Sequence, residues 1–268
     1  MGASNLTAQA FFDLGSFAHS SLFENCEYVW EGLRNIAPYL NRHLEGNVTA
    51  VGCFRQPLPR TVVLWQGRVW HERFEILGGD VTKGAFRLLI EGREIGDAVV
   101  LYAGSVLWDE RITLGPGSVV EPGALIQGPT IIGSHTEVRQ GAYVRGNCII
   151  GDGCVVGHTT EIKTSMMLND AKAGHFAYIG DSILGNATNL GAGTKLANLK
   201  ISAGTIRVKA GANSIDTGLR KFGAVLGDHV ELGCNAVTNP GTVLGKGCVV
   251  FPVTSVPSGY HEPKSIVR

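Results

Sequence analysis

An aliphatic residue returns at every sixth position from Leu114 onward, and this period constrains the fold more than any other feature of the chain. The first run has ten members: Leu114, Val120, Ile126, Ile132, Val138, Val144, Ile150, Val156, Ile162 and Leu168. The period resumes with Leu184, Leu190 and Leu196, and again from Leu226 to Val256. Helical amphipathicity repeats every 3.6 residues and a lone strand every two, so neither explains a period of six. A hexad repeat is typical of a parallel β-helix, in which three short strands form one triangular coil of roughly 18 residues.

A second column of residues, four positions after the first, contains only small side chains. Its members are Ser118, Ala124, Thr130, Thr136, Ala142, Cys148, Cys154 and Thr160. We predict that the aliphatic side chains fill the interior of a prism and that the small ones lie at its crowded corners. Glycine relieves backbone strain at such corners and is frequent here, at 37 residues. The predicted fold class is therefore mainly β, with a parallel β-helix over residues 96–268.

Residues 1–95 lack this repeat and are predicted to form a helix and strand lead-in domain of the α+β type. Apolar residues at three- and four-residue steps between Leu22 and Ile36 predict an amphipathic helix that stops or kinks near Ala37. Pro38 can open a short second helix that ends at Gly46. Strands are expected over 48–54, 61–65 and 68–74. Within the β-helix, residues 198–220 do not follow the hexads, and we expect them to form an inserted loop.

The charge and the cysteine content exclude several classes of protein. Lys and Arg number 23 and Asp and Glu number 23, so nothing predicts binding to nucleic acid or to a membrane surface. No apolar run approaches the ~20 residues of a membrane span. The stretch Met1–Leu6 has no basic signal-peptide region, and Leu6 stands where N-myristoylation needs Ser or Thr. Six cysteines are few for a disulfide framework, so we expect buried free thiols in a cytoplasmic protein.

Two cations are spaced by one coil of the predicted prism. Arg145 and Lys163 both follow an inward aliphatic residue and are 18 residues apart, so they stack on one corner about 4.8 Å apart. Stacked like charges repel, and an anion such as a phosphate between them would remove the repulsion. The alternative, two solvated surface cations, remains open at this point.

The hexad period is interrupted between Leu168 and Leu184, which are 16 residues apart, and His175 lies inside that interruption. An isolated histidine is most often structural. Breaks in a regular scaffold, however, are where function is expected, and an imidazole near two cations is a candidate general base.

Four phrases carry a resemblance to a known family. They are Tyr143-Val-Arg-Gly146, Gly157-His-Thr-Thr-Glu-Ile-Lys163, Lys172-Ala-Gly-His-Phe-Ala-Tyr-Ile-Gly-Asp181 and Asn189-Leu-Gly-Ala-Gly-Thr194. Residues 110–268 resemble the left-handed β-helix, hexapeptide-repeat acyltransferases. They are similar to the C-terminal acetyltransferase domain of bifunctional N-acetylglucosamine-1-phosphate uridyltransferase/glucosamine-1-phosphate acetyltransferase and of related sugar-1-phosphate nucleotidyltransferase-like proteins. The resemblance implies a left-handed helix and a homotrimer with sites between subunits.

The resemblance also implies roles for individual residues. His175 matches the general base, and the residues that match substrate contacts are Arg145, Lys163, Tyr178, Asn189 and Lys221. The residues that match cofactor contacts are Ala192, Asn198, Cys234, Pro252 and Arg268. Within that set, the backbone N–H of Ala192 would polarise the acetyl carbonyl. One departure is Leu199, which stands where the family tends to place Tyr, in front of a longer loop.

The activity implied is acetyl transfer from acetyl-CoA to the amine of an amino-sugar 1-phosphate, without a metal. The sequence has no nucleotidyltransferase domain, so nucleotidyl transfer is not expected. A non-catalytic trimeric module that binds sugar phosphate or nucleotide, or serves assembly, is the alternative. A zinc-dependent carbonic anhydrase is disfavoured, because its site needs two histidines close in sequence, whereas His135, His158, His175 and His229 are widely spaced.

Overall fold

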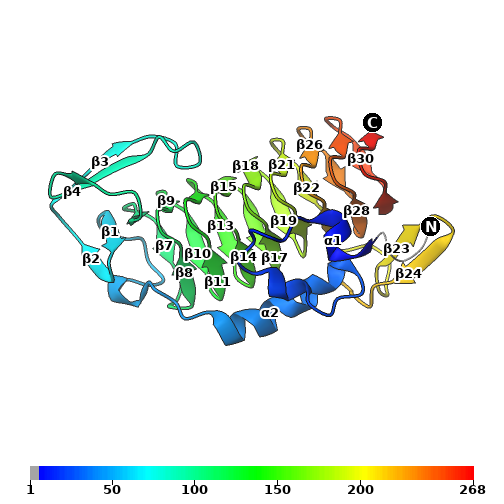
Figure 1. The fold of residues 1–268 in the computed structure, drawn as a ribbon, viewed down its shortest axis with the longest axis horizontal. Helices are drawn as coiled ribbons and strands as arrows, with labels where there is room; N and C mark the ends of the chain where they lie inside the picture. Colours follow the sequence, from blue (N-terminus) through cyan, green and yellow to red (C-terminus); the bar gives the residue numbers. More distant parts are fainter. Residues whose placement is uncertain (1–5) are drawn as a thin grey trace.

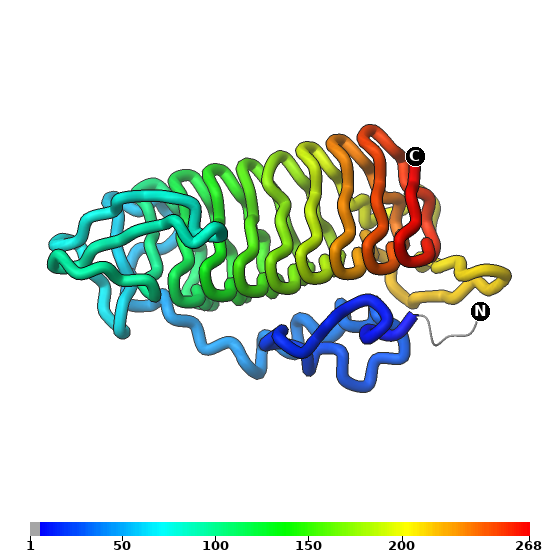
Figure 2. Tube along the Cα trace, turned by 45° about the horizontal axis from the view of Figure 1, so that its top comes forward, coloured from blue at the N-terminus to red at the C-terminus, as the bar shows by residue number. Residues whose placement is uncertain are grey.

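The computed structural model describes residues 6–268, and from Val99 to the end the chain winds as a left-handed parallel β-helix (Figures 1 and 2). Residues 1–5, on which the expectations about signal peptide and myristoylation rest, lie outside the described residues. Among the described residues, no helix combines the length and the hydropathy needed to cross a membrane. The predicted fold class is confirmed.

Three stacks of parallel strands form the three faces of the prism. Face I contains β6 (Val99–Leu101), β9 (Val119–Val120), β12 (Glu137–Val138), β15 (Val155–His158), β18 (Lys172–His175), β21 (Asn189–Leu190), β26 (Glu231–Leu232), β29 (Val249–Val250) and β32 (Ile266–Val267). Face II contains β7 (Val106–Leu107), β10 (Leu125–Gln127), β13 (Tyr143–Arg145), β16 (Glu161–Lys163), β19 (Tyr178–Gly180), β22 (Lys195–Leu196), β27 (Val237–Thr238) and β30 (Ser255–Val256). Face III contains β8 (Ile112–Leu114), β11 (Thr130–Ile132), β14 (Cys148–Ile150), β17 (Ser165–Met167), β20 (Ile183–Leu184), β25 (Ala224–Leu226), β28 (Thr242–Leu244) and β31 (Gly259–His261). Each coil passes from face I to II to III, so the three edges are I–II, II–III and III–I.

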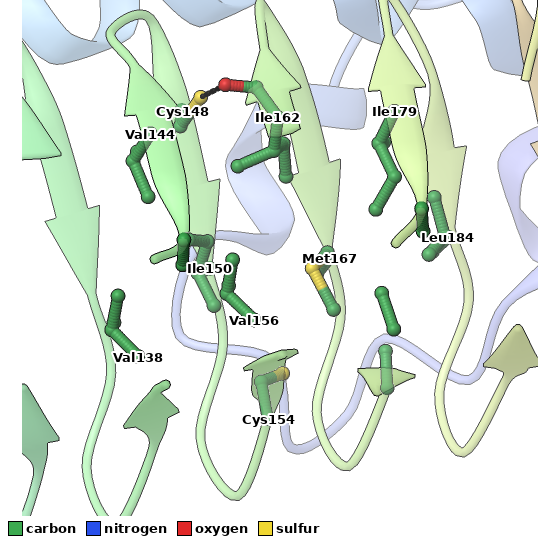
Figure 3. Packing of buried hydrophobic residues seen from close by; sticks show 14 of the residues in the cluster. Val138, Val144, Cys148, Ile150, Cys154, Val156, Ile162, Met167, Ile179 and Leu184 are labelled. Carbon is green, nitrogen blue, oxygen red and sulfur yellow. Dashed lines mark hydrogen bonds between the residues drawn. The ribbon is translucent and has the colours of Figure 1, made fainter. Parts of the chain in front are cut away.

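The interior of the prism is filled as the two columns predict (Figure 3). The aliphatic residues from Leu114 to Ile162 and the small residues from Ser118 to Thr160 expose at most 1% of their surface. Cys148, Cys154 and Cys248 are buried free thiols, which confirms their packing role. Burial raises the pKa of the Cys148 and Cys154 thiols to about 12, so both stay protonated.

The prediction is wrong for one member of the aliphatic column, Leu168. Met167, and not Leu168, pairs with Ile150 and enters the interior, while Leu168 packs outside the prism against the N-terminal segment. The inward step from Ile162 to Met167 is five residues, and a second five-residue step leads from Ile179 to Leu184. The predicted interruption is therefore two single-residue deletions on edge II–III. His175 lies between them, in the regular strand β18.

The N-terminal segment runs along the outer surface of face III (Figure 2). It contains α1 (Ala8–Phe11), the 3-10 turns η2 (Ser20–Phe23) and η3 (Val29–Glu31), and α2 (Gly32–His43). Its apolar residues pack on the outward side chains of face III, among them Ile149, Met166 and Ile183. The predicted stop near Ala37 is wrong, because α2 continues through Pro38, and the helix begins at Gly32 and not near Leu22. Leu33, Ile36 and Leu40 are buried on both sides of Pro38, and this packing holds the helix together.

A small unit closes the N-terminal end of the prism. The predicted strand over 48–54 is instead the 3-10 turn η4 (Thr49–Val51), whereas β1 (Val62–Trp65) and β2 (Arg68–Trp70) form the expected hairpin and extend face I. The antiparallel arm β3 (Phe74–Gly78), β4 (Arg87–Ile90) and β5 (Arg93–Glu94) then folds back onto face I (Figure 1). A hydrogen bond fixes the loop between β3 and β4 to face I: the backbone N–H of Val81 donates to the buried carboxylate of Glu137 at 2.7 Å.

The insertion after Leu196 is an ordered β-hairpin, β23 (Arg207–Ala210) and β24 (Asn213–Asp216), which projects near the C-terminal end of the prism (Figure 1). Leu196 pairs with Thr238 across it, so the coils continue in register. Val208 and Ile206 pack on the N-terminal segment. With face III covered by that segment and the start of face I by the arm, face II and the later coils of face I are left open by the elements just described.

Candidate active site

The predicted residues lie mainly on the two edges that border face II. Arg145 and Lys163 end β13 and β16, and the pairing of Val144 with Ile162 puts them at neighbouring levels of edge II–III. His175 ends β18 on face I, where edge I–II begins, and its side chain is exposed. Face II therefore separates the two cations from the imidazole within one chain.

Each cation on edge II–III already has a carboxylate partner. Arg145 Nη1 donates to Glu161 Oε1 at 2.6 Å, and this hydrogen bond raises the pKa of the guanidinium. Lys163 Nζ donates to Asp181 Oδ2 at 2.6 Å, with both side chains largely buried. The repulsion expected from stacked cations is thus relieved inside the protein, and the net charge of the four groups is zero.

Asn198 connects this edge to face II. Its side-chain Nδ2 donates to Asp181 Oδ2, and the hydroxyl of Tyr178 donates to its Oδ1 at 3.5 Å. Asn198 is 9% exposed, and its carbonyl accepts the backbone N–H of Phe222 at 2.9 Å where the hairpin returns to the prism. Tyr178, Asn198, Asp181 and Lys163 therefore form one continuous hydrogen-bonded network.

The other edge aligns His175 with three of the predicted cofactor residues. Gly193 N donates to His175 O at 3.0 Å, Asn235 N to Ala192 O at 2.8 Å, and Val253 N to Cys234 O at 2.9 Å. These bonds stack edge I–II at successive levels, in the order His158, His175, Ala192, Cys234 and Pro252. Within residues 6–268 the Ala192 N–H has no backbone acceptor. Arg268 follows β32, with its guanidinium 5.0 Å from the centre of the Phe251 ring.

Three further residues lie apart from these edges or beside them. Asn189 opens β21 on face I, where its Nδ2 donates to Glu231 Oε2 at 3.0 Å, so one chain does not bring it to Arg145 and Lys163. Lys221 is exposed at the base of the hairpin, next to Phe222 on edge II–III. Leu199, the departure from the family pattern, exposes 49% of its surface there.

Sequence reasoning missed the two carboxylates and two aromatic rings. The 18-residue spacing that linked Arg145 to Lys163 also links Lys163 to Asp181, and strand alternation puts Glu161 on the same face as Lys163. His158 pairs directly with His175. The Phe176 ring lies edge-on to the His158 ring, with centroids 5.1 Å apart. Neither ring had a signal beyond its hexad position.

The arrangement suits recognition of an anion on edge II–III and offers an exposed imidazole on edge I–II. Lysine has three N–H donors and arginine five, so both cations keep free donors after binding their carboxylates. The described residues contain no cluster of three or more His, Cys, Asp or Glu side chains that could hold a metal ion. The site is open to solvent along the whole of face II.

Comparison with known proteins assigns the β-helix. A family model described as the GMPPB C-terminal domain matches residues 126–266. The bifunctional sugar-1-phosphate nucleotidylyltransferase/acetyltransferase of Sulfurisphaera tokodaii is 35% identical over 108 residues, which are 40% of this chain and 27% of that protein. The bifunctional protein GlmU of Methylibium petroleiphilum is 34% identical over 183 residues, which are 66% of this chain and 35% of that protein. The chain thus spans about a quarter to a third of these relatives, and the resemblance found in its motifs is confirmed.

Two solved acyltransferase structures align with part of the chain. UDP-N-acetylglucosamine acyltransferase of Francisella novicida aligns with a TM-score of 0.39 and 14% identity, over 59% of this chain and 58% of that one. The corresponding enzyme of Campylobacter jejuni aligns with a TM-score of 0.35 and 18% identity, over 62% and 70%.

Proposed function

Since the chain belongs to the family of the GMPPB C-terminal domain, whose matched relatives are bifunctional nucleotidylyltransferase/acetyltransferases, we propose that it is an acetyl-CoA-dependent N-acetyltransferase. The acceptor proposed is an amino-sugar 1-phosphate of the glucosamine 1-phosphate type. The observation that carries the proposal is the alignment of edge I–II, where His175 is followed at the next levels by Ala192, Cys234 and Pro252.

In the proposed reaction His175 accepts a proton from the acceptor amine while the amine nitrogen attacks the thioester carbonyl carbon. A tetrahedral oxyanion forms, and the unpaired Ala192 N–H stabilises it. The C–S bond then breaks, and the leaving coenzyme A thiolate takes the proton from the His175 imidazolium, which regenerates the neutral base. The free donors of Arg145 and Lys163 hold the phosphate, which fixes the amine relative to the thioester.

The substrate and cofactor sites are proposed to approach one another across two copies of the chain. Within one copy, face II lies between the cations of edge II–III and the imidazole of edge I–II. A second copy packed on that face would enclose an open site and bring Lys221 and Asn189 toward it. The proposed assembly is a homotrimer.

Replacement of the base tests the activity. His175→Ala should lower acetyl transfer to glucosamine 1-phosphate by roughly 10²–10⁴-fold, the contribution of a general base, with the assembly intact. Thiol release from acetyl-CoA measures the rate. The matched control is His229→Ala, which removes an exposed histidine from edge III–I and should leave the rate unchanged. Equal rates for wild type and His175→Ala would refute the assignment.

The second candidate is a non-catalytic module that binds sugar phosphate or nucleotide, and the paired state of Arg145 and Lys163 is compatible with it. Binding of acetyl-CoA separates the two functions. Cys234 is the exposed cysteine of the six, so a thiol reagent should modify it first. Saturating acetyl-CoA should slow that modification if the cofactor occupies edge I–II. Unchanged modification together with no measurable acetyl-CoA binding favours the non-catalytic module.

A further inference from the structure

Phe176 occupies a backbone position that the fold forces into the left-handed region. The third residue after each inward apolar residue of face I has positive φ in eight successive coils, and four of these eight residues are glycines. Phe176 is the aromatic member of this column, with φ of 52°. Bulky residues adopt this region at a cost, and such strain concentrates at functional sites.

Burial does not compensate for the strain at Phe176. It is 56% exposed, so more than half of its surface remains in contact with solvent. The ring lies next to two imidazoles: its centroid lies 5.1 Å from that of His158, at an interplanar angle of 76°, and 6.4 Å from that of His175. His158 belongs to the same coil as Lys163. The ring thus lies beside two imidazoles on edge I–II, whereas Lys163 of the same chain lies across face II on edge II–III.

We propose that Phe176 is a specificity-determining residue whose exposed ring face receives the amine-bearing part of the acceptor. This inference rests on the proposed function and deepens it. An aromatic face attracts a cation within about 6 Å of its centre, so the ring favours the ammonium form of an amino sugar. The ring also covers the apolar carbons of the sugar. Two ligands lose the attraction between the ring and a cation: an acceptor without the amine, and the N-acetylated product, whose amide nitrogen carries no charge.

The test compares two ligands that differ only in the amine. Calorimetric titration of glucosamine 1-phosphate and glucose 1-phosphate is carried out on the full chain, as wild type and as Phe176→Leu. Leucine keeps an apolar side chain but has no π face. Phe176→Leu should weaken binding of glucosamine 1-phosphate roughly two- to thirtyfold and abolish its preference over glucose 1-phosphate. Binding of acetyl-CoA should not change.

Two further variants separate recognition from folding. Val253→Gly relieves left-handed strain in the same column, at φ of 61°, on a side chain that is 78% exposed. It should keep wild-type affinity for glucosamine 1-phosphate, and Phe176→Gly should lose it although its Tm is unchanged or higher. Unchanged affinity in both Phe176 variants overturns the inference.

The outcomes for Phe176 and for the proposed activity are distinct. If wild type transfers acetyl and Phe176→Leu does so with the same KM for the sugar, the role of Phe176 fails and the activity stands. If wild type binds the amino sugar in a Phe176-dependent way but transfers no acetyl, the activity fails and the role of Phe176 stands. Binding of neither sugar by wild type overturns both.

Discussion

Charge neutrality at edge II–III decides how a phosphate can bind there. Glu161 and Asp181 already neutralise Arg145 and Lys163, so a phosphate must compete with two carboxylates in place. The two ion pairs differ: Arg145 and Glu161 expose 41% and 35% of their side chains, whereas Lys163 and Asp181 expose 16% and 12%. An exposed ion pair contributes little to stability and is the easier one to exchange. We therefore expect Glu161 to limit the affinity for the phosphate.

Glu161→Gln tests this competition. Glutamine keeps a hydrogen-bond acceptor for Arg145 but removes the negative charge, so affinity for inorganic phosphate and for glucosamine 1-phosphate should rise by up to about fivefold, with thermal stability nearly unchanged. Calorimetry gives the affinities. Glu94→Gln, which removes the carboxylate from the exposed pair with Arg87 on the distant arm, is the control and should change neither. Weaker phosphate binding in Glu161→Gln would contradict the expectation.

The sequence predicted the positions of the site residues better than their contacts. Hexad arithmetic was sufficient to place Arg145 and Lys163 at neighbouring levels, because it depends on backbone register alone. It could not reveal that Asn198 joins Tyr178 to Asp181, because Asn198 reaches them only where the hairpin leaves the prism.

At the scale of the coil, the sequence error at Leu168 has a physical cause. Met166 and Leu168 are buried outside the prism because the N-terminal segment covers face III, so inward and outward residues are both apolar there. Alternation of apolar and polar residues, which fixes register on a half-exposed sheet, is then lost. For that reason the sequence did not reveal that the inward step after Ile162 is five residues long. On the open face II, where outward residues are polar or half-exposed, the hexads were assigned correctly.

Thr238 is a polar residue at a position of the aliphatic column, and its replacement gives a prediction about the stability of the fold. It lies inside the prism between Leu196 and Val256, is fully buried, and its hydroxyl has no hydrogen-bond partner. Thr238→Val keeps the shape and removes the unpaired hydroxyl, so the free energy of unfolding should rise by about 1 kcal/mol. Urea unfolding measures it.

The same coil supplies the control for Thr238. Thr242 is equally buried, but its hydroxyl donates to Asn239 O at 2.7 Å. Thr242→Val leaves that carbonyl with one bond fewer and should lower the free energy of unfolding by about 1 kcal/mol. Equal changes in the two variants would mean that the hydroxyl at 238 is satisfied in solution.

In the whole molecule, the three faces of the prism differ in how far other elements cover them. Face III is covered by the N-terminal segment, and the first coils of face I are covered by the arm. Face II keeps Leu125, Tyr143, Tyr178 and Val237 half-exposed along a flat, continuous surface. The candidate site borders this same face on both edges. Covering face II with a second copy would remove apolar surface from water and enclose the site in one step.

Val237→Asp tests whether face II is where copies meet. Val237 points outward from β27, so a charge there should leave the protomer folded. It lies at a different level of the prism from Arg145, Lys163 and His175. Wild type should sediment at three times the 28.4 kDa of one chain, and Val237→Asp at or near one chain with acetyl transfer lost. Val249→Asp adds the same charge to an outward position of face I and should leave the assembly intact. A wild-type monomer that is fully active, or a Val237→Asp variant that stays trimeric, would rule out face II as the shared surface and leave the site to be completed by one chain.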